Sequence, residues 1–324
     1  MGEDRRCRPG EPPHRFGPQV SLHIPWDTVE SYGKLAEYAV GLGMTIGAIN
    51  SNVIQDDDHL PWSLCNSDRR MRIKAIHHHR GCIEIRTQTG STDLKIWLRD
   101  GTNYPGQDDL RSRQERLAEC LAEIYAALQR GQRMILEYKF FEPAFYATDI
   151  SDWGTSLFHC MALGDRATVV LDTGHHAPGT NLKFVVMQLL RVGRLGAFDF
   201  NSRFYADDDR MVGAADPFQM FRIVHEIVLA DALRPDSGVS FTLDQCHKIE
   251  PKIPGQIRSI MNEQEATAKA LLVDHEALAT AQQADSVPSA NGILMDAFAR
   301  SGYLEQIAAE RVGGNQSGLG RVNR

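Results

Sequence analysis

Residues 171–181 read LDTGHHAPGTN, and this stretch decides how the rest of the chain is interpreted. The apolar run at residues 167–171 leads into it, and Asp172 follows that run, with His175 and His176 close behind. A short apolar run of this kind is typical of a buried strand. Carboxylate and imidazole groups at the end of a strand are suited to a divalent metal ion. We therefore predict a metal site at the mouth of this strand.

Acidic residues follow other apolar runs in the same way. Glu137 lies late in MILEYK, Asp199 lies in GAFDFN, and Asp244 ends VSFTLDQ. Asp207 and Asp209 lie in YADDDR; such a triplet is usually a solvated loop, but its carboxylates can chelate a cation from one loop. These positions predict one shared site. The candidate ligands outnumber what one ion needs, so we expect two ions, and the carboxylate-rich set favours Mn²⁺, Mg²⁺ or Co²⁺.

Strand-like and helix-like segments alternate along the chain, which predicts a parallel sheet with helices outside it. The predicted strands are residues 20–24, 44–49, 94–98, 134–138, 168–171, 195–200 and 239–243. The predicted helices are residues 28–42, one ending near Gly90, 109–128, one following Asp152, and then 182–192, 217–230 and 254–281.

An open doubly wound sheet and a (β/α)8 barrel both fit this alternation. An open sheet gathers its ligands at one switch point, whereas the acidic residues here come from at least four strands, which favours the barrel. The glycines of GLGMTIG, residues 41–47, precede a strand instead of following one, so a dinucleotide site is discarded. The fold class is thus α/β, a (β/α)8 TIM barrel at residues 19–285 with a C-terminal helical extension at 286–324 that ends in a glycine-rich tail expected to be mobile.

Composition limits what the site can serve. The chain has 324 residues, 42% of them hydrophobic, and a formal net charge of −7, which argues against a nucleic-acid partner. No apolar run approaches the roughly 20 residues of a membrane span, and the Arg- and Pro-rich lead at residues 1–18 is expected to be disordered. The six cysteines are widely spaced, which predicts reduced thiols and a cytoplasmic protein.

Several side chains near the predicted strand ends suit a polyhydroxylated ligand. Glu137 and Lys139 are two residues apart on one strand, so they leave the same face. Aromatic groups at or just past strand ends can wall a sugar site, with ring faces against C–H surfaces; they are His23, Trp26, Trp97 and Phe145. The histidines at residues 77–79 lie in a helical stretch, where a surface or packing role is expected. The whole pattern predicts a metal-dependent sugar site.

Seven motifs in order resemble the bacterial L-rhamnose isomerases of the non-enteric type, over about residues 20–281. They are HIPWD (23–27), DGTNYPGQ (100–107), EYKFFEPAFY (137–146), DWGTS (152–156), DTGHHAPGTN (172–181), FYADDD (204–209) and LDQCH (243–247). The resemblance implies a xylose isomerase-like TIM barrel, a two-metal centre usually filled by manganese, a homotetramer, and interconversion of L-rhamnose and L-rhamnulose.

The resemblance also implies roles for single residues. A structural ion would be held by Glu137, Asp172, Asp199 and Asp244, and a catalytic ion by His175, Asp207 and Asp209. Lys139, His23 and Asp244 would take part in catalysis, and His23, Trp26, Trp97, Lys139 and His175 would contact the sugar.

Two departures from the family stand out. Well-known members have histidine, in FHFN, where this chain has Asp199 in FDFN, so the site is more anionic and should prefer the harder ions Mn²⁺ or Mg²⁺. Relatives also have a longer segment before the first strand, where it helps to cover a neighbouring subunit's site.

Four alternatives remain open from the sequence. Another aldose isomerase or a ketose epimerase on the same barrel would need only different contacts to sugar hydroxyls. A metal-dependent phosphoesterase would need cations for the phosphate, and the motifs supply mainly Lys139 and Arg203. A sugar-binding relative without activity would show no turnover with any metal. Hydrogen transfer between C1 and C2 as a hydride or through an enediol cannot be separated by sequence.

Overall fold

The computed structural model describes residues 18–53, 62–142, 146–205 and 207–300. The chain divides into two compact units. Unit 1 comprises Met1–Leu171, Gly193–Ala197 and Leu233–Ser240, and unit 2 comprises Asp172–Val192, Phe198–Ala232 and Phe241–Arg324. The boundary runs through three strands, so the first residues of these strands belong to unit 1 and their last residues to unit 2.

Seven strands of the described residues form one sheet. Pairing is parallel from β1 to β7. β8 continues in the same direction, because the amides of Val169 and Thr173 donate to the carbonyls of Arg194 and Asp199. In sheet order the strands are β1 (Gln19–Ile24), β2 (Thr45–Ser51), β3 (Asp93–Ile96), β4 (Arg133–Glu137), β7 (Ala167–Asp172), β8 (Leu195–Phe200) and β9 (Ser240–Leu243).

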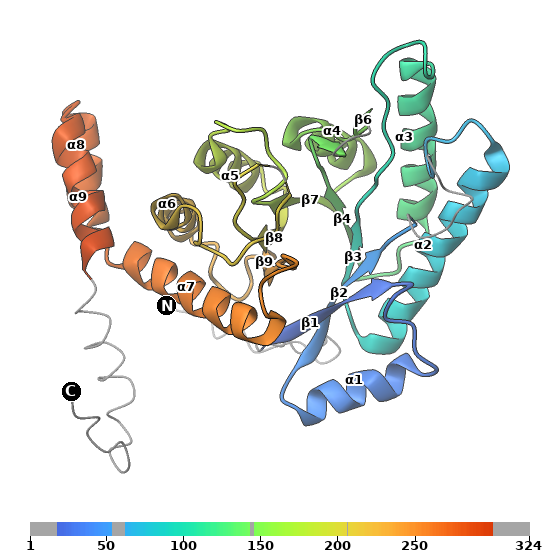
Figure 1. The fold of residues 1–324 in the computed structure, drawn as a ribbon, viewed down its shortest axis with the longest axis horizontal. Coiled ribbons are helices and arrows are strands. Elements are labelled where there is room, and N and C mark those ends of the chain that lie inside the picture. Colours follow the sequence, from blue (N-terminus) through green and yellow to red (C-terminus); the bar gives the residue numbers. More distant parts are fainter. Residues whose placement is uncertain (1–17, 54–61, 143–145, 206, 301–324) are drawn as a thin grey trace, which may run out of the picture. The chain divides into compact units, whose positions relative to one another are not determined.

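Helices connect successive strands of this sheet (Figure 1). Six of the described helices begin at a serine or aspartate whose side chain accepts a hydrogen bond from a backbone amide of the first turn, which satisfies a donor that the helix itself cannot; these caps are Ser31, Asp68, Asp109, Asp152, Asp216 and Asp274. The helices are α1 (Tyr32–Gly41), α2 (Arg69–Thr89), α3 (Leu110–Ala126), α4 (Trp153–Leu163), α5 (Leu182–Arg191), α6 (Pro217–Leu229), α7 (Lys252–Leu271), α8 (His275–Gln283) and α9 (Val287–Ala299).

The predicted alternation of strands and helices is confirmed, with two differences in detail. The single helix predicted over residues 254–281 is wrong, since α7 ends at Leu271 and α8 starts after Asp274, whose carboxylate accepts the amide of Ala277 at 2.9 Å. A short antiparallel pair, β5 (Phe141–Glu142) with β6 (Tyr146–Ala147), was not predicted. The sheet has seven strands among the described residues, whereas the predicted closed barrel has eight. Residues 1–17 and 301–324, with most of the predicted lead and tail, lie outside the described residues.

Within unit 1, α2 packs on β2 and β3 and contacts both α1 and α3 (Figure 1). Asp93 is the first residue of β3 and Arg133 the first of β4. The Arg133 guanidinium donates two hydrogen bonds to the Asp93 carboxylate, with Nε–Oδ1 2.6 Å and Nη2–Oδ2 2.8 Å. Burial alone would raise the pKa of Asp93, but the hydrogen bonds and charge of Arg133, together with Thr92 and Arg86, outweigh it and lower that pKa. This pair ties the amino-terminal ends of the two strands together.

Within unit 2, α6 packs against α5 and α7, and α8 packs against α9. The inward face of α6 includes the buried side chains of Phe221, Val224 and His225. The His225 ring stacks on His275 of α8, with ring centroids 5.3 Å apart and an interplanar angle of 16°. Burial, and secondarily the neighbouring His275, lowers the pKa of His225 to about 4. The native state therefore holds His225 neutral.

We expect His225 to make the protein less stable as the pH falls from about 6.5 to about 4. In this window the unfolded chain, with a histidine pKa near 6.5, binds a proton that the folded state does not, so the free energy of unfolding decreases with falling pH. The loss from this residue alone amounts to about 3 kcal/mol by pH 4. The variant His225→Phe keeps an aromatic ring and removes the titration, so urea unfolding between pH 7 and pH 4 should show a shallower decline. Equal slopes in the two proteins would contradict this.

No helix in the described ranges is both long enough and apolar enough to span a membrane. Five cysteines of these ranges have free thiols, four of them buried (Cys65, Cys82, Cys120 and Cys160) and one exposed (Cys246).

Candidate metal centre

An apolar layer of the sheet leads directly to the predicted ligands. Ile135 of β4, Val170 of β7 and Ala197 of β8 form a core cluster in which each side chain is at most 1% exposed. Side chains two residues apart on a strand leave the same face. The next residues on that face are therefore Glu137, Asp172 and Asp199. Each of these acidic residues therefore lies two positions after a residue of the apolar layer on the same strand.

Glu137 belongs to unit 1 and is buried, with 6% of its surface exposed. Its Cα partner across the ladder is Val170, which lies two residues before Asp172. Glu137 thus has the strand position that the sequence predicted for it.

Three of the predicted ligands converge within unit 2. Asp172, Asp199 and Asp244 each offer a carboxylate oxygen, and these oxygens lie within 4.8 Å of one another. Asp172 and Asp199 are each 1% exposed. The backbone brings the strand ends together, since the amide of Asp244 donates to the carbonyl of Phe200 at 3.0 Å. Buried carboxylates this close repel one another strongly unless a cation or a proton neutralises them.

The Asp172 carboxylate is oriented by donors that the sequence analysis did not identify. The amide of Gly174 donates to Oδ1 at 2.6 Å, and Nδ2 of Asn201 lies 3.0 Å from Oδ1 and 3.2 Å from Oδ2. Asn201 is itself held, because its amide donates to Oγ1 of Thr173 and its carbonyl accepts from that hydroxyl. A Cβ on residue 174 would lie 2.7 Å from Oδ1 of Asn201 and 3.1 Å from Oδ1 of Asp172, so a larger residue there would displace the Asn201 amide from this position. Asn201 lies two residues after Asp199, but this spacing alone does not indicate that its side-chain amide reaches Asp172.

We expect Asn201→Ala to weaken divalent-metal binding about 10- to 100-fold, because the residues that orient metal ligands typically contribute this much. Isothermal titration with Mn²⁺ measures the affinity. Asn262→Ala is the matched control, since Asn262 is also in unit 2 and donates to a backbone carbonyl, that of Val212 at 2.8 Å. Equal affinities in both variants would show that Asn201 does not support the metal site.

A second group of predicted ligands lies beside the first. Nε2 of the buried His175 is 2.7 Å from Oδ1 of Asp207, and His175 and Asp172 offer ligand atoms within 4.8 Å of each other. Asp209 completes no group of three closely spaced ligands in the described part of the chain. Its backbone has a different function, because its carbonyl accepts from the amides of Cys246 and His247. The structure therefore brings His175 and Asp207 into contact, and Asp209 follows two residues later in the same loop.

The loop that carries Asp207 is held by the central residue of the DDD triplet. The carboxylate of Asp208 accepts from the amides of Phe204 and Tyr205 at 2.8 and 3.1 Å. Asp207 and Asp209 on either side have positive φ angles of 54° and 43°. Aspartate tolerates this left-handed backbone better than most residues. The triplet thus combines the loop-stabilising carboxylate of Asp208 with that of Asp207, which contacts His175.

Two further side chains near these ligands are His176, which is uncharged, and Arg203, which donates to the backbone. Burial, and secondarily the nearby His175 and Arg203, lowers the pKa of His176 to about 3, so this imidazole is neutral. Arg203 donates to the backbone carbonyls of Tyr205 and Ala177 at 3.3 and 3.1 Å. A guanidinium engaged in this way supports a loop, which weakens the phosphoesterase alternative, for which Arg203 was to bind phosphate.

Lys139 of unit 1 is buried, with 4% of its surface exposed. Its ammonium donates to Oε2 of Glu142 at 3.1 Å and lies 5.3 Å from the centre of the Trp97 ring. A cation over an aromatic face is attracted to it. Lys139 and Trp97, which were both predicted to contact a sugar, are therefore neighbours.

The remaining predicted sugar contacts lie at the end of β1. The His23 and Trp26 rings are 6.0 Å apart at 45°, and Trp26 is 50% exposed. Nδ1 of His23 lies 3.2 Å from Nδ2 of Asn52. Phe145 lies outside the described residues. Of the three adjacent histidines in α2, His79 is fully buried and its Nδ1 contacts Oγ of Ser51 at 2.5 Å, which is the packing role expected.

Comparison with known proteins gives the family. The chain is 38% identical over 291 residues to a probable sugar isomerase of Rhizobium meliloti, covering 88% of this chain and 67% of the relative. It is 37% identical over 287 residues to a probable sugar isomerase of Mesorhizobium japonicum, covering 87% of this chain and 66% of the relative. The chain therefore belongs to the family of these probable sugar isomerases, and it spans about two thirds of their length. No family model matches it.

Solved structures share the fold. L-ribulose 3-epimerase aligns with a TM-score of 0.53 at 14% identity, over 93% of this chain and 89% of that one. A D-tagatose 3-epimerase-like protein aligns with a TM-score of 0.59 at 13% identity, over 76% and 87%. The IolI protein, solved with a zinc atom, aligns with a TM-score of 0.50 at 17% identity, over 78% and 87%. At these identities the likeness shows the fold alone.

Proposed function

We propose that this protein is a divalent-metal-dependent aldose–ketose isomerase that interconverts L-rhamnose and L-rhamnulose. The observation that carries the proposal is the convergence of the Asp172, Asp199 and Asp244 carboxylates within 4.8 Å at the ends of packed strands. The family of probable sugar isomerases supports the reaction class. The seven sequence motifs support L-rhamnose as the sugar.

The residues fit a hard divalent ion. Oxygen ligands without thiolates are the set that Mn²⁺ and Mg²⁺ prefer, and the buried negative charge needs a cation. Asp172, Asp199 and Asp244 would hold one ion, with Glu137 as the fourth ligand that the resemblance to the L-rhamnose isomerases implies. His175, Asp207 and Asp209 would hold a second ion. We propose Mn²⁺ for both, and Mg²⁺ or Co²⁺ as substitutes.

The chain's own residues would bind and polarise the open-chain sugar. A bound divalent ion supplies Lewis-acid polarisation of the sugar carbonyl and lowers the pKa of bound water. Lys139 would donate to the oxygen at C1 or C2 and stabilise negative charge that develops there as hydrogen moves between the two carbons. His23 would assist ring opening by exchanging a proton with the ring oxygen. Trp26 and Trp97 would cover the apolar face of the sugar and exclude water.

Two further properties belong to this proposal. The sheet would form part of a (β/α)8 barrel, as the likeness to the ketose 3-epimerases suggests. The protein would act in the cytoplasm as a homotetramer, in keeping with its free thiols and with the resemblance to L-rhamnose isomerases. Light scattering of the full chain measures the number of subunits.

The test is turnover by the metal-stripped full chain with and without Mn²⁺. L-Rhamnose is supplied, and ¹³C NMR follows L-rhamnulose. Product that depends on the metal in the wild type and in His78→Ala, and that is lost in His175→Ala, supports the proposal. A second incubation starts from L-rhamnulose, and its C3 epimer as the main product would instead support a ketose 3-epimerase. No product with Mn²⁺, Mg²⁺ or Co²⁺ in a folded protein would overturn the proposal.

A further inference from the structure

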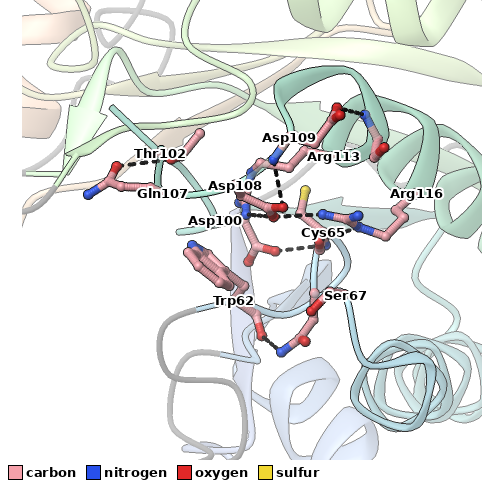
Figure 2. Close-up of polar contacts among 12 residues, drawn as sticks. Trp62, Cys65, Ser67, Asp100, Thr102, Gln107, Asp108, Asp109, Arg113 and Arg116 are labelled. Carbon is pink, nitrogen blue, oxygen red and sulfur yellow. Dashed lines mark hydrogen bonds and ion pairs between the residues drawn. The ribbon is translucent and has the colours of Figure 1, made fainter. Parts of the chain in front are cut away.

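A buried ionic network in unit 1 joins three loops that each follow a strand of the sheet. These loops connect β2 with α2, β3 with α3, and β4 with α4. Figure 2 shows side chains of the first two loops near the start of α3, where Arg113 and Arg116 meet Asp108 and where Cys65 and Asp100 lie alongside. Loops at the carboxyl ends of parallel strands are where α/β proteins build their sites. The network is thus on the functional side of the sheet.

Arg113 is the centre of this network. It is 0% exposed, and its guanidinium makes a two-pronged contact with Asp149, with Nε–Oδ1 3.0 Å and Nη2–Oδ2 2.6 Å. Its third nitrogen, Nη1, donates to Asp108 at 3.0 Å, and its plane lies 4.7 Å from the centre of the Trp62 ring. Each of the three guanidinium nitrogens therefore donates to a carboxylate.

The other two loops are joined to the same point through Asp100. Its carboxylate accepts from the amide of Ser63 at 2.8 Å, from the hydroxyl of Ser63 at 2.5 Å and from the amide of Cys65 at 2.9 Å. Its carbonyl accepts from the amide of Asp149 at 2.9 Å. The Cys65 thiol lies beside the carboxylates of Asp100 and Asp149. Burial, and then these two carboxylates, raise the pKa of the thiol, so it is protonated and packs as a small apolar group.

The segment held by Arg113 is also the segment that holds Lys139. The amide of Lys139 donates to the carbonyl of Ile150 at 3.1 Å, and the hydroxyl of Thr148 donates to the carbonyl of Lys139. Asp149 lies between these two residues. The backbone of Lys139 is thus fixed on both sides by residues adjacent to the carboxylate that Arg113 binds.

We propose that the Arg113–Asp149 ion pair is a positioning device that sets where the Lys139 ammonium stands over Trp97. The expected effect on catalysis rests on the proposed function, because Lys139 is the group proposed to bind the sugar oxygens. Arg113 and Asp149 touch no reacting atom in this scheme. They act by holding residues 148–150, and through them Lys139, in one place. Displacement of a catalytic group by about 1 Å can cost on the order of 100-fold in rate.

The chain offers a matched control for a merely structural role. Arg133 and Asp93 form the same two-pronged pair in the same unit, but at the amino-terminal ends of β3 and β4. Asp149→Asn and Asp93→Asn each remove the charge of one carboxylate that binds an arginine, the fully buried Arg113 in one case and the partly exposed Arg133 in the other. Both variants should lose thermal stability. Only Asp149→Asn should change the position of the Lys139 ammonium over the Trp97 ring.

The experiment measures two properties of both variants. The first is kcat/KM for L-rhamnose with Mn²⁺, together with Mn²⁺ affinity; we expect Asp149→Asn to lose about 100-fold in kcat/KM at unchanged metal affinity, and Asp93→Asn to lose less than about threefold. The second is ¹⁹F NMR of protein labelled with 5-fluorotryptophan, which has four resonances because the chain has four tryptophans. The Trp97 resonance, assigned with Trp97→Phe, should shift in Asp149→Asn and stay unchanged in Asp93→Asn.

The outcomes separate the two proposals. If the wild type turns over no sugar, the proposed function fails. The Trp97 resonance then still tests whether the Arg113–Asp149 pair positions Lys139. If Asp149→Asn and Asp93→Asn have the same kinetics and the same Trp97 resonance, the pair is structural only and the inference is overturned. If Asp149→Asn does not fold, Arg113→Lys replaces it, since lysine keeps the charge but cannot make the two-pronged contact.

Discussion

Asp172→Asn should reduce isomerase turnover about a thousandfold, which corresponds to about 4 kcal/mol of lost transition-state stabilisation. Asp172 is close to Asp199 and Asp244 on one side and to His175 on the other, so its loss weakens both proposed metal groups. The same change should make the metal-free protein more stable. Two carboxylates whose oxygens lie within 4.8 Å of each other repel by roughly 3 kcal/mol or more at an effective dielectric of about 20, and the asparagine removes one charge.

The measurement is turnover with saturating Mn²⁺, together with the melting temperature in EDTA. His78→Ala in α2 is the control and should change neither. The opposite signs of the two effects identify a ligand, since a residue needed only for folding would lower both. Turnover near the wild-type value would remove Asp172 from the site, and a lower melting temperature in EDTA would mean that no repulsion is stored there.

Lys139→Met should lower kcat for the sugar about 100-fold while leaving Mn²⁺ affinity unchanged. Loss of one well-placed donor to a developing negative charge typically costs 100- to 1000-fold. Methionine retains most of the volume and the contact with Trp97, so the change removes charge more than packing. Steady-state kinetics and isothermal titration with Mn²⁺ measure the two effects.

Glu142→Gln is the matched control, because it alters the acceptor of the Lys139 ammonium without removing the ammonium itself. We expect it to lose less than about tenfold in kcat. Equal kcat values for Lys139→Met and the wild type would exclude Lys139 from the chemistry.

The strands and their ligand positions could be predicted because one physical rule determines both. A parallel strand covered on both faces must be apolar, so a carboxylate can appear only where the strand leaves the core. Residues 167–171 and Asp172 show this in the sequence, and the structure has β7 at Ala167–Asp172. The same reasoning found Asp199 and Asp244, and these three side chains do converge.

The break between α7 and α8 could also have been read from the sequence. The apolar spacing continues through it, which favoured one long helix. Asp274, however, precedes a new helical stretch and caps it through the amide of Ala277. The capping interaction of Asp274 therefore starts a new helix even though the apolar spacing continues through this position.

Asn201 and Arg113 could not be identified in this way. An asparagine after a strand is common, and nothing local shows that its amide reaches the carboxylate of a different strand. Arg113 is inside a helix, where an arginine usually faces water, and its partner Asp149 is 36 positions away. Their roles depend on contacts distant in sequence, which require the folded chain. Asp207 and Asp209 were equivalent in the sequence, and only the geometry of their loop separates them.

The step from the Ile135, Val170 and Ala197 layer to the acidic residues has a consequence for how this family can diversify. The apolar layer supplies the packing, and the ligand layer comes after it on each strand, so a ligand can be exchanged without repacking the core. Asp199, where the resemblance to the L-rhamnose isomerases implies an imidazole, would be such an exchange. Under the proposed function, metal preference could then change through one ligand residue while the packed layer beneath it stays the same.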